Sequence, residues 1–163
     1  MQLSVEPVNK ITRDAVLALE VLPEHMAFSG LPSETLPLAE TDPCRIPMAV
    51  LESDRVVGFF VLCWGEQIAH FASSETTMGF RAFLIDASEQ GKGFGTQVFA
   101  ALKEFLLEHH CECTELNLTV NTKNIRAYRA YLRAGFEDSA GLYHGGKFGP
   151  QHVLSLPIVA NKT

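Results

Sequence analysis

The chain has 163 residues, of which 47% are hydrophobic and 20% are charged, and its net charge is −6. This composition is ordinary for a globular protein with its own core, so we expect residues 1–163 to form a single domain. The negative charge argues against a nucleic-acid partner, and the lack of a signal peptide or of an apolar run of about 18 residues predicts a cytoplasmic protein without membrane association.

The first third of the chain predicts a strand, a helix and a long loop. Residues 3–5 form the strand, and Thr12 or Asp14 caps a helix that continues to about Val21. Residues 24–47 contain one glycine and four prolines, so we expect an irregular segment with one or two helical turns. A loop of this length in a small domain is often functional.

The rest of the chain predicts a sheet with helices. Apolar runs at 46–51 and 56–63 surround a polar turn and form a hairpin, whereas residues 65–79 have no clear pattern. The later elements are a strand over 79–87, a helix over 95–109, a strand over 114–120, a helix over 124–134 and two strands within 136–158. This order predicts a mixed sheet with helices packed on its faces.

Four cysteines occur in the chain, and with no export signal we expect them to be reduced: Cys44, Cys63, Cys111 and Cys113. The segment 109–113, His-His-Cys-Glu-Cys, suggests a metal site. However, these residues lie where a helix runs into a strand, and no second cluster completes a four-coordinate site. We therefore predict no metal.

Charge is distributed unevenly along the chain. Residues 1–80 hold four basic and eleven acidic groups, whereas residues 81–163 hold nine basic and eight acidic groups. The first half would suit a cationic ligand and the second half would tolerate an anionic one, although acidic surfaces also serve solubility alone.

Three glycines, Gly91, Gly93 and Gly95, separate the strand over 79–87 from the strong helix that follows. A helix start has unpaired N–H groups and a partial positive charge, and glycines let those amides approach an anion such as a phosphate. The alternative is a tight turn that needs glycine dihedrals, but three alternating glycines favour anion binding. The spacing G-x-G-x-G matches neither the dinucleotide fingerprint nor the nucleoside triphosphate loop.

Two motifs carry a family resemblance. The loop Gln90-Gly91-Lys92-Gly93-Phe94-Gly95 resembles the Q/R-x-x-G-x-G/A loop of the GNAT superfamily of N-acetyltransferases. Residues 124–136, NIRAYRAYLRAGF, resemble the family's N-x-x-A-x-x-x-Y-x-x-x-G-F helix. With the element order, the resemblance covers residues 46–136. Ile85-Asp86 and the glycine loop are also similar to bacterial members that acetylate polyamines and diamines.

The resemblance implies an α/β fold of the α+β kind, with a central mixed, mostly antiparallel sheet of about six to seven strands and about four flanking helices. It implies acetyl-CoA as co-substrate, held between a strand at 79–87 and a neighbour at 114–120 that splays from it. Loop amides would bind the pyrophosphate. The implied coenzyme-binding residues are Phe83, Leu84, Ile85, Gln90, Gly91, Lys92, Gly93, Phe94, Gly95, Thr96, Asn124 and Tyr131.

The resemblance also places Tyr131 as the general acid that protonates the departing thiolate, which leaves Tyr128 as the better candidate for a core aromatic. The base is not identified: Glu34, Glu66, His70 and Glu75 lie in segments that could reach an acceptor, and a water relay would also serve. Of these, Glu34, Glu66 and Glu75 are our candidates for acceptor binding. His144 and His152 are weaker candidates for the base.

Several charged side chains surround the implied site without an assigned role. Arg126, Arg129 and Arg133 form one face of the helix over 124–134, which is either a contact for the coenzyme's ribose phosphate or a solvated face. Lys92 would either add charge at the phosphate or remain solvated. Asp86 and Glu89 are acids beside a predicted anion site, and we expect their carboxylates to point away from it.

The function predicted is transfer of the acetyl group from acetyl-CoA to a primary amine of a small cationic acceptor, a polyamine or diamine first. An aminoglycoside, an amino acid or a protein N-terminus are alternative acceptors. A different class of function is a non-catalytic acyl-CoA sensor, which would keep the glycine loop without needing Tyr131. A homodimer is compatible with these features.

Overall fold

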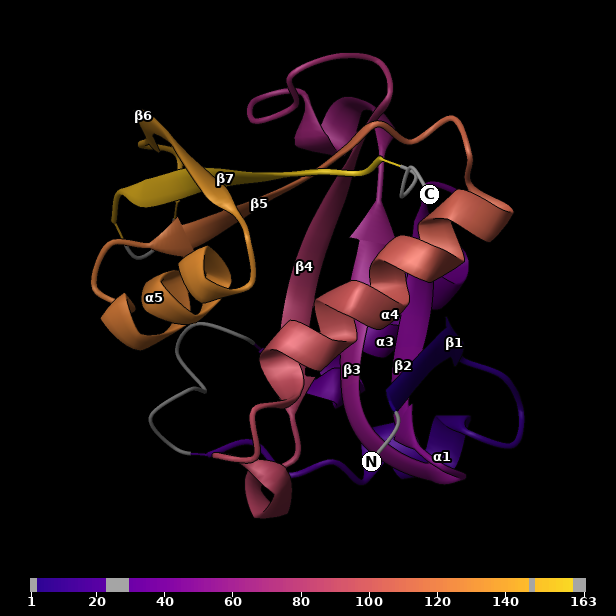
Figure 1. The fold of residues 1–163 in the computed structure, drawn as a ribbon. Coiled ribbons are helices and arrows are strands. Elements are labelled where there is room, and N and C mark those ends of the chain that lie inside the picture. Colours follow the sequence, from indigo (N-terminus) through magenta and orange to yellow (C-terminus); the bar gives the residue numbers. More distant parts are fainter. Residues whose placement is uncertain (1–2, 23–29, 147–148, 160–163) are drawn as a thin grey trace.

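Seven strands form one sheet in the order β1-β2-β3-β4-β5-β7-β6 (Figure 1) in the computed structural model, which describes residues 3–22, 30–146 and 149–159. The strands are β1 Leu3–Pro7, β2 Arg45–Glu52, β3 Arg55–Cys63, β4 Thr77–Ile85, β5 Glu115–Asn121, β6 Glu137–Tyr143 and β7 Gln151–Pro157. All neighbours are antiparallel except β4 and β5, which are parallel. The predicted mixed, mostly antiparallel sheet is confirmed.

Helices cover both faces of this sheet. The helices are α1 Arg13–Leu17, α3 Pro32–Thr41, α4 Phe94–His109 and α5 Ile125–Arg133, with short 3₁₀ turns η2 Gly65–Ile68 and η3 Ala87–Glu89. In Figure 1, α4 crosses one face, and α1 and α3 lie behind the other. Strand β3 is buried on both faces because helices cover it on each side.

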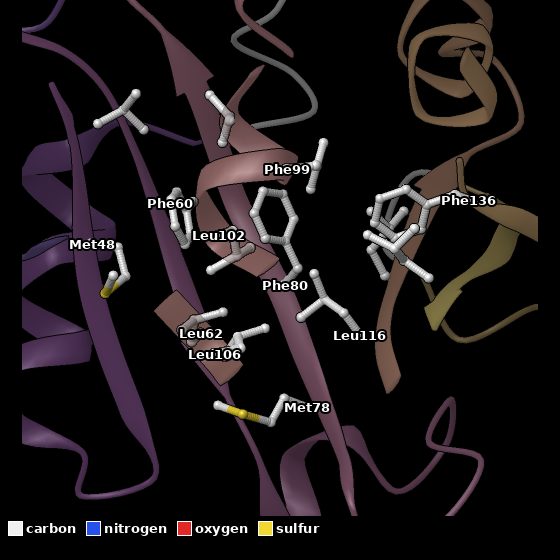
Figure 2. Packing of buried hydrophobic residues seen from close by; sticks show 14 of the residues in the cluster. Met48, Phe60, Leu62, Met78, Phe80, Phe99, Leu102, Leu106, Leu116 and Phe136 are labelled. Atoms are coloured by element: carbon white, nitrogen blue, oxygen red, sulfur yellow. The ribbon is translucent and has the colours of Figure 1, made fainter. Parts of the chain in front are cut away.

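The larger core lies between α4 and the sheet. Its helix residues are spaced by three or four positions, as the sequence predicted: Val98, Phe99, Leu102 and Leu106. The ring of Phe80 lies 4.9 Å from that of Phe60 and 5.0 Å from that of Phe99 (Figure 2). Burial of each such side chain stabilises the fold by about 1.5–3 kcal/mol. This packing fixes the start of α4 relative to the end of β4.

The N-terminal third differs from its prediction. Helix α1 ends at Leu17 rather than near Val21, because the backbone at Glu20 pairs instead with the β4–α4 connection: its N–H donates to Asp86 and its carbonyl accepts from Ala87. Helix α3 is longer than the predicted one or two turns, although Pro37 lies inside it. Burial of Leu36 and Ala39 against the sheet offsets the hydrogen bond that Pro37 removes. Residues 23–29 of the predicted loop lie outside the described residues.

The two parallel strands pair over a short distance and then separate. Backbone pairing joins Thr77–Gly79 to Glu115–Asn117 and stops there. Beyond it, a register shift in the β3–β4 ladder coincides with Ala82, whose φ of 58° is left-handed. A bulge of this kind bends its strand. In Figure 1 the β5–β7–β6 part of the sheet turns away from β4, so that a fork opens between their carboxyl ends.

Gly79 lies at the base of this fork. A Cβ there would come within 2.7 Å of Ile68 and 2.8 Å of the Cys63 sulfur, so the close approach of η2 requires glycine. All four cysteines, which lie within the described residues, are unpaired. Among the described residues, no helix is long and apolar enough to cross a membrane.

Candidate active site

The fork between β4 and β5 contains a cleft of about 630 Å³. It is lined by Phe80–Phe83 of β4 and by Leu118–Asn121 of β5, the residues directly beyond the paired stretch of these strands. Helices α3 and α5, the segment 67–71, and residues Tyr143 and Gln151 complete the lining. Because the strands no longer pair here, their facing backbone edges are available to a ligand.

Tyr131 lines this cleft from α5. Its ring packs edge-on against Phe99 at 5.9 Å and Phe136 at 5.6 Å, which fixes its direction. Burial raises the pKa of the phenol above its ordinary value near 10, because the anion would lose its hydration. The phenol therefore stays protonated at neutral pH, which is the state that a proton donor needs.

Tyr128, the predicted core aromatic, packs against the larger core cluster but is only partly buried. Its hydroxyl donates to the Asp138 carboxylate at 2.6 Å, and its ring stacks on His152 at 4.2 Å. This hydrogen bond raises the pKa of Tyr128 and lowers the pKa of Asp138. The two tyrosines of α5 thus have different surroundings: Tyr128 is tied to β6 and β7, and Tyr131 lines the cleft.

Asn124 begins α5 and lines the same cleft. Its side-chain oxygen accepts from the N–H of Ala127 at 3.4 Å, which caps the helix. The sequence left open whether this residue caps the helix or contacts the coenzyme, and its position is compatible with both. The cap fixes the first turn of α5 and hence the position of Tyr131 two turns later.

The glycine loop lies at the end of β4, where α4 begins. Gly91 and Gly93 have φ values of 81° and 73°, so their left-handed backbone accounts for glycine at both positions. Gly95 has no such need, and a Cβ built on it meets no atom within 4 Å. Within the part of the chain that the structure describes, no side chain caps the start of α4.

These features fit a pyrophosphate. The N–H groups of the first turn of α4 lack intrahelical partners, and the space in front of Gly95 is open to an anion. The loop follows directly on β4, whose residues 80–83 line the cleft. A long ligand could therefore extend from the loop along β4 to Tyr131.

The three residues predicted on β4 differ in their surroundings. Phe83 lines the cleft, whereas Leu84 is buried in the second core cluster, beneath α1 and α3. The carbonyl of Ile85 accepts from the side chain of Gln90 at 2.8 Å. Gln90 thus stabilises the strand end through its side chain, and its predicted contact with the coenzyme would be through the backbone.

The acidic candidates are separated by the fold. Glu34 on α3 lines the cleft, whereas Glu66 and Glu75 are exposed and do not line it. His70 also lines it, and its ring lies 4.3 Å from that of Tyr143. His152 binds Asp138 and stacks on Tyr128, outside the lining. Of the three acids predicted to bind the acceptor, Glu34 is the one that lines the cleft.

The sequence analysis missed several other lining residues, among them Gln67, Arg81 and Tyr143. The amide of Gln67 donates to the carbonyls of Cys44 at 3.0 Å and Trp64 at 3.1 Å, so its orientation is fixed. Its oxygen is buried without a partner among the described residues. No local pattern marks these residues, because the cleft collects them from segments far apart in the chain.

The predicted basic residues near the site do not line the cleft. Arg126, Arg129 and Arg133 are exposed on α5, and none of them lines the cleft. Lys92 forms an ion pair with Glu89 at 2.7 Å. The histidine and cysteine segment 109–113 forms no metal site: among the described residues, no group of three or more metal-ligating side chains is close enough to hold an ion.

Comparison with known proteins identifies the family. Residues 14–136 match the acetyltransferase (GNAT) family. YbbJ, an uncharacterized N-acetyltransferase of Bacillus subtilis, is 32% identical over 128 residues, which cover 78% of this chain and 79% of that protein. The chain belongs to the GNAT family. It is therefore an N-acetyltransferase, and its co-substrate is acetyl-CoA.

Other GNAT relatives act on two kinds of amine. The aminoglycoside N(6')-acetyltransferase type 1 of Klebsiella pneumoniae is 33% identical over 115 residues, 61% of this chain and 56% of that protein. The spermine/spermidine N(1)-acetyltransferase of Bacillus subtilis is 26% identical over 149 residues, 90% of this chain and 95% of that protein. A structure of AAC(6')-Ib in complex with ribostamycin and coenzyme A has a TM-score of 0.77 at 19% identity, covering 96% of this chain and 94% of that one, and supports the fold.

Proposed function

We propose that this GNAT protein acetylates a primary amine of a small cationic acceptor, with a polyamine or diamine favoured, by direct attack of the amine on acetyl-CoA in a ternary complex. The observation that carries the proposal is the cleft itself. Tyr131 from α5 and Glu34 from α3 line it together, at the point where β4 and β5 separate. A proton donor and an ammonium-binding carboxylate thus share one space.

Different segments of the chain would bind different parts of the coenzyme. The amides of residues 90–96 and the dipole of α4 bind the pyrophosphate, and the free edge of β4 near Phe83 pairs with the pantetheine arm. Asn124, at the start of α5, lines the same cleft and would contact this arm. Holding both reactants in the fork replaces an encounter in solution by an oriented contact, which is a large part of catalysis in such transfers.

Proton transfer follows from the position of Tyr131. Acetyl-CoA supplies an activated thioester carbonyl, and the neutral amine attacks it. Tyr131 donates its phenolic proton to the departing sulfur, and burial keeps this proton on the oxygen until then. The amine loses its own proton to water in the cleft, or to His70, which lines the same space.

A cationic acceptor is supported by the lining of the cleft. Glu34 is its one carboxylate among the described residues, beside the guanidinium of Arg81, and the rings of Phe71 and Tyr143, a type of group that attracts ammonium, also line it. The acidic first half of the chain and the likeness to the Bacillus subtilis spermine/spermidine acetyltransferase support a polyamine. The higher identity to the Klebsiella pneumoniae enzyme supports an aminoglycoside as the second candidate.

Two further expectations remain proposals. We propose that residues 1–163 form one domain, because strands from β1 to β7 belong to the same sheet. A homodimer and a cytoplasmic location remain predictions of the sequence.

The test is a thiol-release assay with acetyl-CoA and a panel of spermidine, a diamine, ribostamycin, a free amino acid and a peptide. Spermidine or the diamine should have the highest kcat/KM. A neutral or acidic acceptor that reacts faster would refute the cationic preference, and ribostamycin as the best substrate would favour the second candidate.

Two tyrosine variants separate an enzyme from a coenzyme sensor. Tyr131→Phe should lower kcat by about a hundredfold while coenzyme A binding is retained. Tyr128→Phe is the matched control, since it removes the same group from the same helix but outside the cleft, and its kcat should match that of the wild type. Equal turnover of all three proteins would exclude the acid role of Tyr131.

A further inference from the structure

Glu89 is a buried carboxylate next to the loop that we assign to an anion. It ends η3, and its side chain is only 4% exposed. A negative charge at this place opposes the binding of pyrophosphate through direct repulsion. If Glu89 favours coenzyme binding, it must do so through another interaction that outweighs this repulsion.

The partners of Glu89 connect two distant parts of the chain. One carboxylate oxygen accepts from Arg55 at the start of β3, and the other accepts from Lys92 of the glycine loop at 2.7 Å. Arg55 also donates to Glu52 at 2.8 Å, across the β2–β3 turn. These two cations keep the pKa of Glu89 below its ordinary value, so the carboxylate is ionised at neutral pH.

Other contacts hold the loop at its ends. Before the glycines, Gln90 donates to the carbonyl of Ile85, and Asp86 accepts from the N–H of Glu20. After them, the loop continues into α4 and its core. Between these anchors lie two glycines with left-handed φ, and the side chain between them belongs to Lys92. Among the described residues, the ion pair between Lys92 and Glu89 is the side-chain contact that holds this middle part.

We infer that Glu89 is a positioning residue for the coenzyme: it binds Lys92 and thereby fixes the backbone of residues 91–93 with its amides toward the pyrophosphate. This inference rests on the proposed function. Lys92 then acts as the anchor of the loop, with its ammonium directed to Glu89. The ordering of two glycines, which lose more conformational freedom than other residues, is what the carboxylate contributes.

The experiment compares Glu89→Gln with Glu52→Gln by calorimetric titration with coenzyme A. Glu52 is the matched control because it binds the same Arg55 and its change removes the same charge, but it does not contact the loop. A positioning role predicts that Glu89→Gln raises the Kd by about threefold to tenfold, while Glu52→Gln leaves it unchanged. A direct charge effect predicts the opposite sign, tighter binding by Glu89→Gln.

Steady-state kinetics add a second readout. For Glu89→Gln we expect a higher KM for acetyl-CoA, while the KM for the amine and the kcat stay unchanged. A purely structural role would instead reduce the fraction of folded enzyme, which lowers the apparent kcat and leaves both KM values unchanged. Lys92→Gln, at a side chain that is 47% exposed, should fold normally and should raise the Kd by a similar factor. The double variant should then be no weaker than either single variant, because both changes break one contact.

The outcomes distinguish this inference from the function on which it rests. Unchanged or tighter coenzyme A binding by Glu89→Gln overturns the positioning role alone, and so do additive losses in the double variant. Absence of coenzyme A binding by the wild type overturns the proposed function and the inference with it.

Discussion

Gly95 allows a test in which stability and ligand binding respond in opposite directions. It is the second residue of α4, its added Cβ meets no atom within 4 Å, and its backbone φ is not left-handed. Substitution by Asp is therefore sterically allowed. A carboxylate in the first turn also interacts favourably with the helix dipole, so Gly95→Asp should stabilise the fold by about 0.5–1 kcal/mol.

The same carboxylate should repel the pyrophosphate of the coenzyme. Two negative charges about 5 Å from a third interact with about 2 kcal/mol even at the dielectric constant of water, and more in a partly enclosed loop. The Kd for coenzyme A should therefore rise by roughly tenfold to a hundredfold. For a chain of this size, the gain in stability should raise the Tm by about 1–4 °C.

The assay is calorimetric titration with coenzyme A together with thermal unfolding, and Gly95→Asn is the control because it has the same shape without the charge. Gly95→Asp should bind at least tenfold more weakly than Gly95→Asn, with an equal or higher Tm. Equal affinities of the two variants, with both folded, would show that the pyrophosphate does not lie at this loop.

Further predictions concern the cleft and the two tyrosines of α5. Glu34→Gln should raise the KM for a polyamine by about twofold to fivefold, since Glu34 is exposed, without changing the Kd for coenzyme A; an unchanged KM would remove Glu34 from the acceptor site. Arg81→Gln should lower that KM, because a like charge leaves the cleft, and a higher KM in steady-state assays would contradict this. Because the folded pKa of Tyr131 is raised, its phenol should stay protonated up to at least about pH 10. When the wild type and Tyr131→Phe are titrated with base, their phenolate absorbance should therefore be equal below that pH. Because the folded pKa of Asp138 is lowered by Tyr128, the stabilisation is present above the unfolded pKa of about 3.9 and is lost as pH falls through the folded value, so Tyr128→Phe should lower the Tm at pH 7 but not at pH 2.

Local features of the chain were predictable because their causes are local. The apolar spacing in α4, the Asn124 cap of α5 and the hairpin of β2 and β3 depend on residues within a few positions of each other. The glycine loop belongs to the same group, since its left-handed φ values and the helix start that follows are properties of consecutive residues. The family resemblance rests on these segments as well, which is why Tyr131 could be named as a candidate acid.

The boundaries that failed have tertiary causes. Helix α1 stops at Leu17 because Glu20 pairs with residues 86 and 87, which are more than sixty positions away. Helix α3 forms in spite of Pro37 because Leu36 and Ala39 are buried against the sheet. Neither contact leaves a pattern in the neighbouring sequence.

By itself, the sequence determined the class of fold, the glycine loop before α4 and the helix that carries Tyr131, because each depends on short-range spacing and turn chemistry. The tertiary structure alone decided which of the candidate acids lines the cleft, since Glu34 enters it through the packing of α3 while Glu66 and Glu75 stay outside. It also paired Glu89 with Arg55 of β3, and separated Tyr128 from Tyr131. The physical reason is that the surroundings of a carboxylate or a hydroxyl depend on residues that are distant in the chain. The residues next to it in the sequence do not determine which distant residues these are.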